Sequence, residues 1–272
     1  MRYQSLPGGG QVPVLGLGTW KVGGGSSPDY SQDDRALRGL HAALEMGYAH
    51  IDTAEMYADG HTEELVGRVI QGYNRADLFI TSKVWPSNLA YQAVLGACRS
   101  SLERLRTDYL DLYLIHWPNE AIPLEETFGA LNELVQQGLV RHLGVSNFNL
   151  EQLDRARKLS ETPLATNQVP YSLYNRRYAR NGVLDACQDA GMILTAYTPI
   201  EKGGVVNDSE VVAVAEQVGF SPVQVALAWL INQPGVIAIP MSMNPGHLEQ
   251  NLRAADLELP PDAMGKLGSV YA

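Results

Sequence analysis

The chain contains 272 residues, of which 45% are hydrophobic and 18% charged, with a formal net charge of −10. This balance is ordinary for a globular protein with a full core, and the acidic charge argues against binding to nucleic acid, which needs a basic face. No apolar run reaches the roughly 18 residues of a membrane helix, and MRYQSLPGGGQ lacks the apolar core of a signal peptide, so we expect a cytoplasmic protein with no membrane partner.

Short β-rich segments alternate with segments of helical period along the chain. The segment SLPGGGQVPV predicts a small β-hairpin with a glycine turn. Eight strand–helix pairs follow, and in chain order they are LGLGT with 33–46, YAHIDT with 62–71, LFITSKV with 91–105, LDLYLIHW with 123–137, VRHLGVS with 150–160, TNQVPY with 181–190, MILTAYTP with 209–217 and 222–232, and VIAIPMS with 246–254. Such alternation implies parallel strands with right-handed crossovers. Eight units in roughly 250 residues predict an α/β fold, a closed (β/α)₈ TIM barrel with an N-terminal β-hairpin.

Glycines mark the ends of several predicted helices. Gly47, Gly138 and Gly191 each follow a helix and precede a strand, at the position where a left-handed residue commonly ends a helix. No linker, low-complexity tract or run of charge divides the chain. We therefore expect residues 1–272 to form a single domain.

The rival parallel architecture is a doubly wound sheet with a glycine-rich dinucleotide fingerprint. Its one candidate, GLGTWK at 16–21, has the first two glycines but Lys21 where the third should stand. No GxxxxGK[ST] phosphate loop occurs either. These absences favour the barrel.

Polar and aromatic residues gather at the C-terminal ends of the predicted strands, where barrel enzymes build their sites. In chain order they are Thr19 and Trp20, Asp52, Lys83 and Trp85, His116 and Trp117, Ser146 and Asn147, Gln168, Tyr197, and Ser242. Tyr57 follows Asp52 by five residues. Each residue alone has an ordinary structural explanation, such as a turn, a solvated lysine or a core histidine. Aromatic rings around a few convergent polar groups, however, are typical of a small-molecule pocket.

Asp52, Tyr57, Lys83 and His116 could together deliver a proton to a carbonyl oxygen. A phenol has an ordinary pKa near 10, and a neighbouring ammonium is expected to lower it. A carboxylate beside the lysine would keep the lysine charged and oriented. The tyrosine could then act as a general acid, with the histidine as a second hydrogen-bond donor. Because no side chain supplies hydride, carbonyl reduction would also need a nicotinamide cofactor.

These motifs resemble the aldo-keto reductase family. DTAEMY, SKVW, DLYLIHWP, GVSNF, NQVPYSLYN, AYTPI and IPMS match its signatures in order, between about residue 3 and about residue 265. The resemblance implies a catalytic tetrad with Tyr57 as acid/base, made of Asp52, Tyr57, Lys83 and His116. It implies no metal, and a substrate pocket formed by Trp20, Tyr57, Trp85, His116 and Trp117. The chain is most similar to compact prokaryotic members of the 2,5-diketo-gluconate and methylglyoxal reductase types.

The resemblance also implies a binding site for NADP(H). Ser146, Asn147 and Gln168 would bind the nicotinamide carboxamide, and Tyr197 would stack on its ring. The full set implied for the cofactor is Thr19, Trp20, Ser146, Asn147, Gln168, Tyr197, Thr198, Ile200, Ile239, Ser242, His247, Gln250 and Asn251. Thr198 and Ile200 would lie along the pyrophosphate.

The adenosine end departs from the family pattern, in which a lysine and an arginine clamp the 2′-phosphate of NADPH. In IPMSMNPGHLEQN, Met241 and His247 stand at these two positions, and Gln250 replaces an acidic residue. Without the bidentate guanidinium, discrimination for the 2′-phosphate should weaken. Ser242, His247 and the start of the last predicted helix can still hold a phosphate. We therefore expect NADP(H) to be favoured, with NAD(H) as an alternative.

The predicted pocket is open. The segment NEAIPLEET after HWP is short, and the chain ends soon after the last predicted helix with MGKLGSVYA, whereas family members of narrow specificity carry long loops in both places. We expect small α-dicarbonyls, aldehydes and keto-sugars as substrates, and a monomer, which is the family default.

Two other classes of function are alternatives to this one. A non-catalytic NADPH-binding redox-sensing subunit, as in the potassium-channel β-subunits that resemble this family, is disfavoured by the intact tetrad. A metal-dependent barrel hydrolase is disfavoured because no HxH or carboxylate cluster stands at the strand ends.

Overall fold

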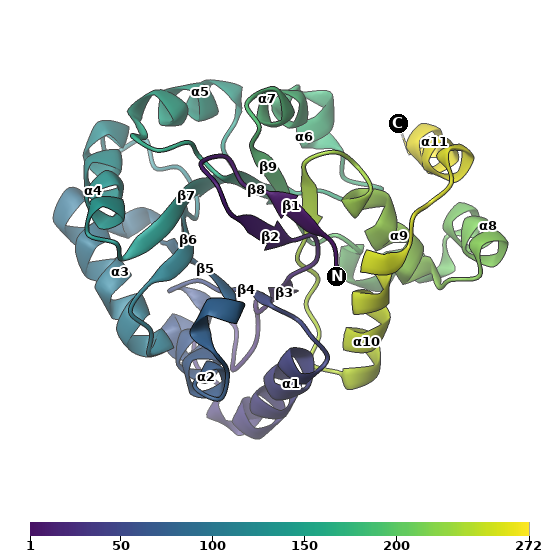
Figure 1. Cartoon of the computed structure of the whole chain (residues 1–272), viewed down its shortest axis with the longest axis horizontal. Coiled ribbons are helices and arrows are strands. Elements are labelled where there is room, and N and C mark those ends of the chain that lie inside the picture. The colour runs from purple at the N-terminus through teal and green to yellow at the C-terminus, as the bar shows by residue number, and fades with distance from the viewer. Residues whose placement is uncertain (272) are drawn as a thin grey trace.

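A computed structural model describes residues 1–271, and these residues contain a ring of eight parallel strands (Figure 1). In chain order the strands are β3 (Leu17–Gly18), β4 (His50–Asp52), β5 (Phe79–Val84), β6 (Leu110–Ile115), β7 (Val140–Ser146), β8 (Thr166–Pro170), β9 (Ile193–Tyr197) and β10 (Val236–Ala238). Each strand pairs with the next one in the sequence. A parallel bridge between Leu15 and Ala238 joins the first strand to the last, and Gly18 N donates to Pro240 O at 3.1 Å. These contacts close the predicted (β/α)₈ barrel.

Helices surround the ring. They are α1 (Asp33–Glu45), α2 (His61–Ile70), α3 (Tyr91–Leu105), α4 (Leu124–Gln136), α5 (Leu150–Leu159), α6 (Arg177–Arg180), α7 (Val183–Asp189), α8 (Ser209–Val218), α9 (Pro222–Ile231), α10 (Pro245–Arg253) and α11 (Pro261–Val270). The predicted ranges agree within one residue at each end, except that 181–190 becomes α7, with the extra short helix α6 before it.

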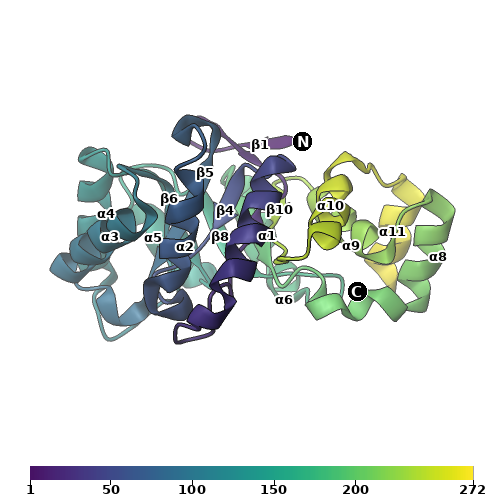
Figure 2. The same cartoon turned by 90° about the horizontal axis from the view of Figure 1, so that it is seen from below.

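The helix α11 corrects the prediction that the chain stops soon after its last helix. It begins with Pro261 at its first position and buries Ala263 and Leu267, which are one helical turn apart. Gly265 and Gly268 weaken the helical signal in the sequence. The helix forms because it packs on α8, beside which it lies in both views (Figures 1 and 2).

The predicted N-terminal hairpin is confirmed and covers one end of the barrel. Its strands β1 (Tyr3–Ser5) and β2 (Gln11–Pro13) are antiparallel, and they cross the middle of the ring in Figure 1. Leu6 and Val12 of the hairpin pack inside the barrel against Phe79 and Ile193, the first residues of β5 and β9. The hairpin therefore covers the N-terminal end of the barrel, opposite the C-terminal ends of the strands.

The predicted glycine helix ends are also confirmed. Gly47, Gly138 and Gly191 have φ values of 101°, 73° and 65°, which place them in the left-handed region that glycine adopts without a steric penalty. Each lets the chain leave its helix and turn directly into the next barrel strand.

The most apolar helical region is the α8–α9 pair. Every residue of α9 after Pro222 is buried, so this helix is covered on all sides by its neighbours. Within residues 1–271 no single helix is long and apolar enough to span a membrane; α8 and α9 meet that criterion only as a pair, bent by 87°.

Candidate active site

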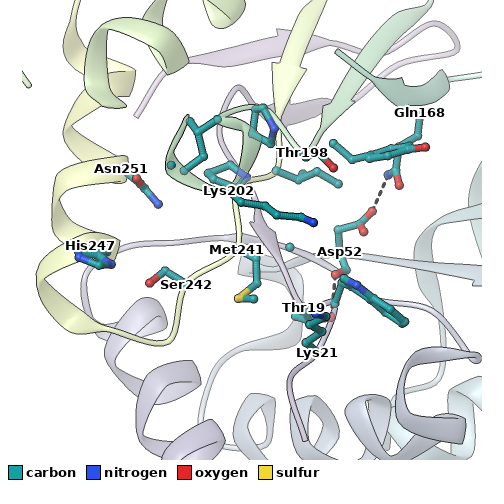
Figure 3. Close-up of a pocket in the computed structure, with 18 of the residues that line it drawn as sticks. Thr19, Lys21, Asp52, Gln168, Thr198, Lys202, Met241, Ser242, His247 and Asn251 are labelled. Carbon is teal, nitrogen blue, oxygen red and sulfur yellow. Dashed lines mark hydrogen bonds between the residues drawn. The ribbon is translucent and has the colours of Figure 1, made fainter. Parts of the chain in front are cut away.

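A cavity of about 920 Å³ opens at the C-terminal end of the strands (Figure 3). Its walls come from β8, from the ends of β3, β4, β7 and β9 and the segments after β3, β4, β6, β7, β9 and β10, and from the start of α9 and α10. The volume falls in the range of small-molecule and cofactor sites. All residues that the sequence predicted for the cofactor line this cavity, as do the predicted catalytic and substrate residues except Lys83 and Trp85.

Asp52 lines the cavity, and its buried ion-pair partner Lys83 lies behind it. Asp52 ends β4, and Lys83 lies near the end of the adjacent strand β5. Lys83 Nζ donates to Asp52 Oδ1 at 2.5 Å, to Thr53 O at 2.9 Å and to the Tyr57 hydroxyl at 3.1 Å. Lys83 is fully buried and Asp52 is 1% exposed. Three acceptors satisfy the three N–H groups of the ammonium, so the lysine is fixed in one orientation.

Tyr57 returns toward Lys83 because of a sharp turn after β4. The short helix η2 (Tyr57–Gly60) contains Ala58 and Asp59 with φ values of 48° and 53°, which L residues rarely adopt. Ala58 N donates to Gly25 O at 2.8 Å. This contact holds the turn against the β3–α1 loop and points the phenol into the cavity.

The electrostatics of Tyr57 differ from the expectation that lysine lowers its pKa. Burial raises the pKa of Tyr57, and the positive charge of Lys83 and its hydrogen bond oppose this effect without cancelling it. The phenol is therefore protonated at neutral pH and available as a donor. The pKa of Lys83 is raised, since the effect of burial is outweighed by Asp52 and Tyr57.

His116 follows β6 and lines the cavity beside Tyr57. The centroids of the two rings are 5.7 Å apart, and the ring of Trp85 packs edge-on against His116 at 5.1 Å. Burial, together with the charge of Lys83, lowers the pKa of His116 to about 2. The imidazole is therefore neutral and can donate only one N–H. Trp85 supports this ring and does not line the cavity.

A second polar network links the predicted carboxamide residues. Gln168 Nε2 donates to Asp52 Oδ2 at 2.7 Å, and Ser146 Oγ donates to Gln168 O at 2.8 Å. The Tyr197 hydroxyl donates to Asn147 Oδ1 at 2.8 Å, while Asn147 Nδ2 donates to Ser146 Oγ at 2.9 Å. These bonds fix the ring of Tyr197 at the cavity wall. Asn147 Oδ1 keeps one lone pair for a ligand.

The adenosine-end residues gather at the start of α10. Asn244 caps this helix by accepting from His247 N at 3.2 Å, and Ser242 Oγ accepts from Asn244 N at 3.1 Å. Ser242, His247 and Asn251 face the same side of the cavity (Figure 3). Met241, which replaces the family's lysine, is 42% exposed.

The structure adds cavity residues that the sequence reasoning missed. One is Lys21, which stands where the third glycine of a dinucleotide fingerprint is missing. Lys202 lies in the short helix η5 (Glu201–Asn207) after β9. The others are Gly18, Met56, Pro199, Gly203, Val206, Ser221, Pro222, Val223 and Pro240. The GTWK and PIEKGG segments each carry a lysine next to a predicted strand end. This position in the sequence is the signal that could have identified Lys21 and Lys202 as cavity residues.

A charged cluster anchors the loop that carries Trp20 and Lys21. His61 Nε2 lies 2.7 Å from Asp33 Oδ1, and His61 Nδ1 lies 3.0 Å from Glu64 Oε2. Burial favours the neutral ring, but Glu64 and Asp33 outweigh it and raise the pKa of His61. The next residue, Thr62, donates its hydroxyl to Val22 O at 2.7 Å. The cluster therefore connects α1, α2 and the β3–α1 loop.

We expect His61→Gln to destabilise the fold in a pH-dependent way. Because the pKa of His61 is raised in the folded state, the protonated ring contributes its full stability below its ordinary value of 6.5. That contribution is lost as pH rises through the higher folded-state pKa. The free energy of unfolding of the wild type should exceed that of the variant by about 1 kcal/mol at pH 5, a modest value because the carboxylates are partly exposed. At pH 9 the difference should be smaller. Urea unfolding at both pH values measures this, and a constant difference would contradict a charged His61.

Comparison with known proteins gives a consistent result over nearly the whole chain. A family model described as the aldo/keto reductase family matches residues 14–272. Methylglyoxal reductase YeaE of Escherichia coli is 38% identical over 266 residues, which cover 96% of this chain and 91% of that protein.

Two solved structures share the fold at high identity. A thermostable aldo-keto reductase in complex with the inhibitor epalrestat has a TM-score of 0.97 and 45% identity, covering 99% of this chain and 100% of that chain. An aldo/keto reductase from Klebsiella pneumoniae, solved with NADP and acetate, has a TM-score of 0.91 and 37% identity, covering 99% and 95% of the two chains. The comparison of folds and the comparison of sequences therefore agree with each other.

Proposed function

The chain belongs to the aldo/keto reductase family, and from this premise we propose that it reduces small aldehydes and α-dicarbonyl compounds with Tyr57 as the general acid. The observation that carries the proposal is a chain of buried hydrogen bonds that runs from Asp52 through Lys83 to the Tyr57 hydroxyl. This chain ends in the cavity beside His116. A protonated phenol backed by a fixed ammonium is suited to donating a proton to oxygen.

The residues of the cavity fit a nicotinamide dinucleotide. The volume of the cavity suits an extended cofactor. Hydrogen-bond donors and acceptors stand at one end on Ser146 and Gln168, and at the other end on Ser242 and His247. The ring of Tyr197, held by Asn147, offers a flat surface for the nicotinamide. A bound reduced nicotinamide supplies the hydride that no side chain can provide.

The tetrad acts on the carbonyl oxygen. Tyr57 donates its hydroxyl proton to the developing alkoxide, and neutral His116 orients the oxygen by donating a second hydrogen bond. The charge that develops on the Tyr57 oxygen is stabilised by Lys83 Nζ at 3.1 Å. Asp52 holds Lys83 in its charged form and is itself fixed by Gln168. Because these partners are in place before reaction, little reorganisation is needed.

The adenosine end supports NADPH as the first choice of cofactor. The relative from Klebsiella pneumoniae was solved with NADP, and the start of α10 with Ser242 and His247 offers donors for a phosphate. Met241 cannot bind the 2′-phosphate as a lysine would. NADH therefore competes better here than in a site with both cations.

The rim of the cavity favours small substrates. Trp20 and Trp117 are 37% and 43% exposed and line the entrance with Met56. No residue of α11 lines the cavity within the described chain, because that helix packs on α8 instead. An open apolar rim suits compact carbonyl compounds of several shapes. The name of the Escherichia coli relative, methylglyoxal reductase, agrees with this substrate class.

Paired titrations with NADPH and NADH, each followed by turnover with methylglyoxal, test this proposal. We expect turnover with NADPH at a lower KM than with NADH. Equal or better use of NADH would show that Met241 and His247 have changed the cofactor choice. Tight binding without any turnover would contradict the enzymatic proposal and support a redox-sensing role.

A further inference from the structure

The ring of His116 lacks the hydrogen bond that usually orients a functional histidine. Such a ring is commonly fixed by a bond between its second nitrogen and a carbonyl or carboxylate group. Within residues 1–271, His116 Nδ1 is buried and has no hydrogen-bond partner. The orientation of the ring therefore depends on the side chains that pack against it. The aromatic ones are Trp85, with ring centroids 5.1 Å apart, and Tyr57, with ring centroids 5.7 Å apart.

Trp85 is the packing partner that takes no part in the proposed chemistry. Its ring meets the His116 ring at 85°, the edge-to-face arrangement that aromatic quadrupoles favour. Trp85 follows directly on the last residue of β5. Its backbone N–H therefore lies beyond the end of the strand and needs an acceptor from elsewhere. The position of the indole ring depends on that acceptor.

Glu55 supplies the acceptor. Its backbone N–H donates to Lys83 O at 3.4 Å, and its Oε1 accepts from Trp85 N at 2.5 Å. The carboxylate thus takes the place of the backbone carbonyl that would accept from Trp85 N if β4 continued beside β5. Oε1 also accepts from Asn88 Nδ2 at 3.0 Å. Bonds to an ionised acceptor are stronger than bonds between neutral groups, so Glu55 holds this segment firmly.

The segment after Trp85 is also held from the loop that follows His116. The short helix η4 (Pro86–Asn88) begins directly after Trp85. Asn119 Nδ2 donates to Pro86 O at 2.8 Å. Glu55 therefore binds this segment from the β4 side and Asn119 binds it from the β6 side. Glu55 is half-buried and does not line the cavity, so its contacts reach the site only through other residues.

We propose that Glu55 is a positioning residue, which fixes the backbone of Trp85 and thereby holds the Trp85 ring against His116. His116 then keeps the direction in which it meets the substrate oxygen. The inference rests on the proposed function, since it concerns how one member of the tetrad is oriented. Because Glu55 does not line the cavity, its removal should affect carbonyl turnover and leave cofactor affinity unchanged.

The test compares two substitutions of Glu55, using kcat/KM for methylglyoxal and the dissociation constant for NADPH. Glu55→Leu removes the acceptor, and kcat/KM should fall by about 10- to 100-fold, the usual loss when a supporting contact of a reacting group is removed. Glu55→Gln keeps an acceptor oxygen and should stay within about threefold of the wild type. Both variants should bind NADPH within about twofold of the wild type.

Glu126→Leu is the matched control. The exposed Glu126 carboxylate also accepts from a backbone N–H, that of Tyr91 at the start of α3, at 2.9 Å. Neither residue lines the cavity. The control therefore removes the same kind of hydrogen bond without touching Trp85, and kcat/KM should not change. An equal loss in Glu55→Leu and Glu126→Leu would overturn the inference.

The double variant Glu55→Leu/Trp85→Ala tests the route of the effect. Trp85→Ala removes the ring through which Glu55 is proposed to act, so the added Glu55→Leu change should cause little further loss of kcat/KM. Losses that multiply would show that Glu55 acts by another route and would overturn the inference. Joint loss of NADPH binding and turnover in Glu55→Leu would overturn it as well, because Glu55 would then serve the fold alone.

The wild type separates this inference from the proposed function. A wild type that neither binds NADPH nor reduces methylglyoxal would refute the proposed function and the inference with it. A wild type that does both, beside a Glu55→Leu variant with unaltered kcat/KM, would refute the positioning role of Glu55 alone.

Discussion

Tyr57→Phe should reduce carbonyl turnover by about 10²- to 10⁴-fold, the usual contribution of a positioned general acid. The substitution removes only the hydroxyl. The ring keeps its edge contact with Trp20 at 5.0 Å and its contact with His116. Lys83 keeps Asp52 and Thr53 O as acceptors. Steady-state kinetics with NADPH and methylglyoxal measure the loss.

Cofactor affinity serves as the control for this variant. The phenol donates to the substrate and not to the cofactor in the proposed mechanism, so the NADPH dissociation constant of Tyr57→Phe should stay within about twofold of the wild type. Turnover near the wild-type rate would show that another group, with His116 as the first candidate, supplies the proton. Loss of NADPH binding together with turnover would instead indicate a structural defect.

Lys83→Met should have the largest combined effect on stability and activity. The change leaves the Asp52 carboxylate 1% exposed, with Gln168 as its one remaining side-chain donor. Breaking a buried ion pair by removing one partner costs about 3–5 kcal/mol, or about 10 °C in Tm for a domain of this size. Turnover should also fall, because the charge that develops on Tyr57 loses its stabilising ammonium. Thermal unfolding and kinetics on the same preparation measure both effects.

The double variant Asp52→Asn/Lys83→Met separates the effect on stability from the effect on turnover. Replacing both members removes the unpaired buried charge, so much of the lost stability should return. Turnover should stay as low as in Lys83→Met, since the ammonium beside Tyr57 is still missing. A double variant with restored activity would show that the ion pair serves stability alone.

The protonation states of Tyr57 and His116 depend on burial as much as on neighbouring charges. In the sequence, Lys83 suggested a lowered pKa for Tyr57, but burial reverses the direction. For His116, burial and Lys83 act in the same sense and keep the ring neutral. A protonated phenol beside a neutral imidazole therefore gives the proposed mechanism its two hydrogen-bond donors over the whole physiological pH range.

The sequence alone determined the barrel and most of its site. Eight alternations of strand and helix specify parallel neighbours, and in a closed parallel barrel all strands end at the same rim. Asp52, Lys83 and His116 therefore had to meet once their strands were identified. The substitution at Met241 was also visible without a structure, because it depends only on residue identity.

The tertiary structure decided what depends on contacts between distant segments. Helix α11 forms through packing on α8, although its two glycines weaken the local signal. The raised pKa of Tyr57 comes from burial by several loops. Glu55 and His116 are 61 residues apart in sequence, and their connection through Trp85 becomes visible only in the folded chain. Periodicity and motif record what each segment prefers, whereas burial and charge pairing are properties of the assembled fold.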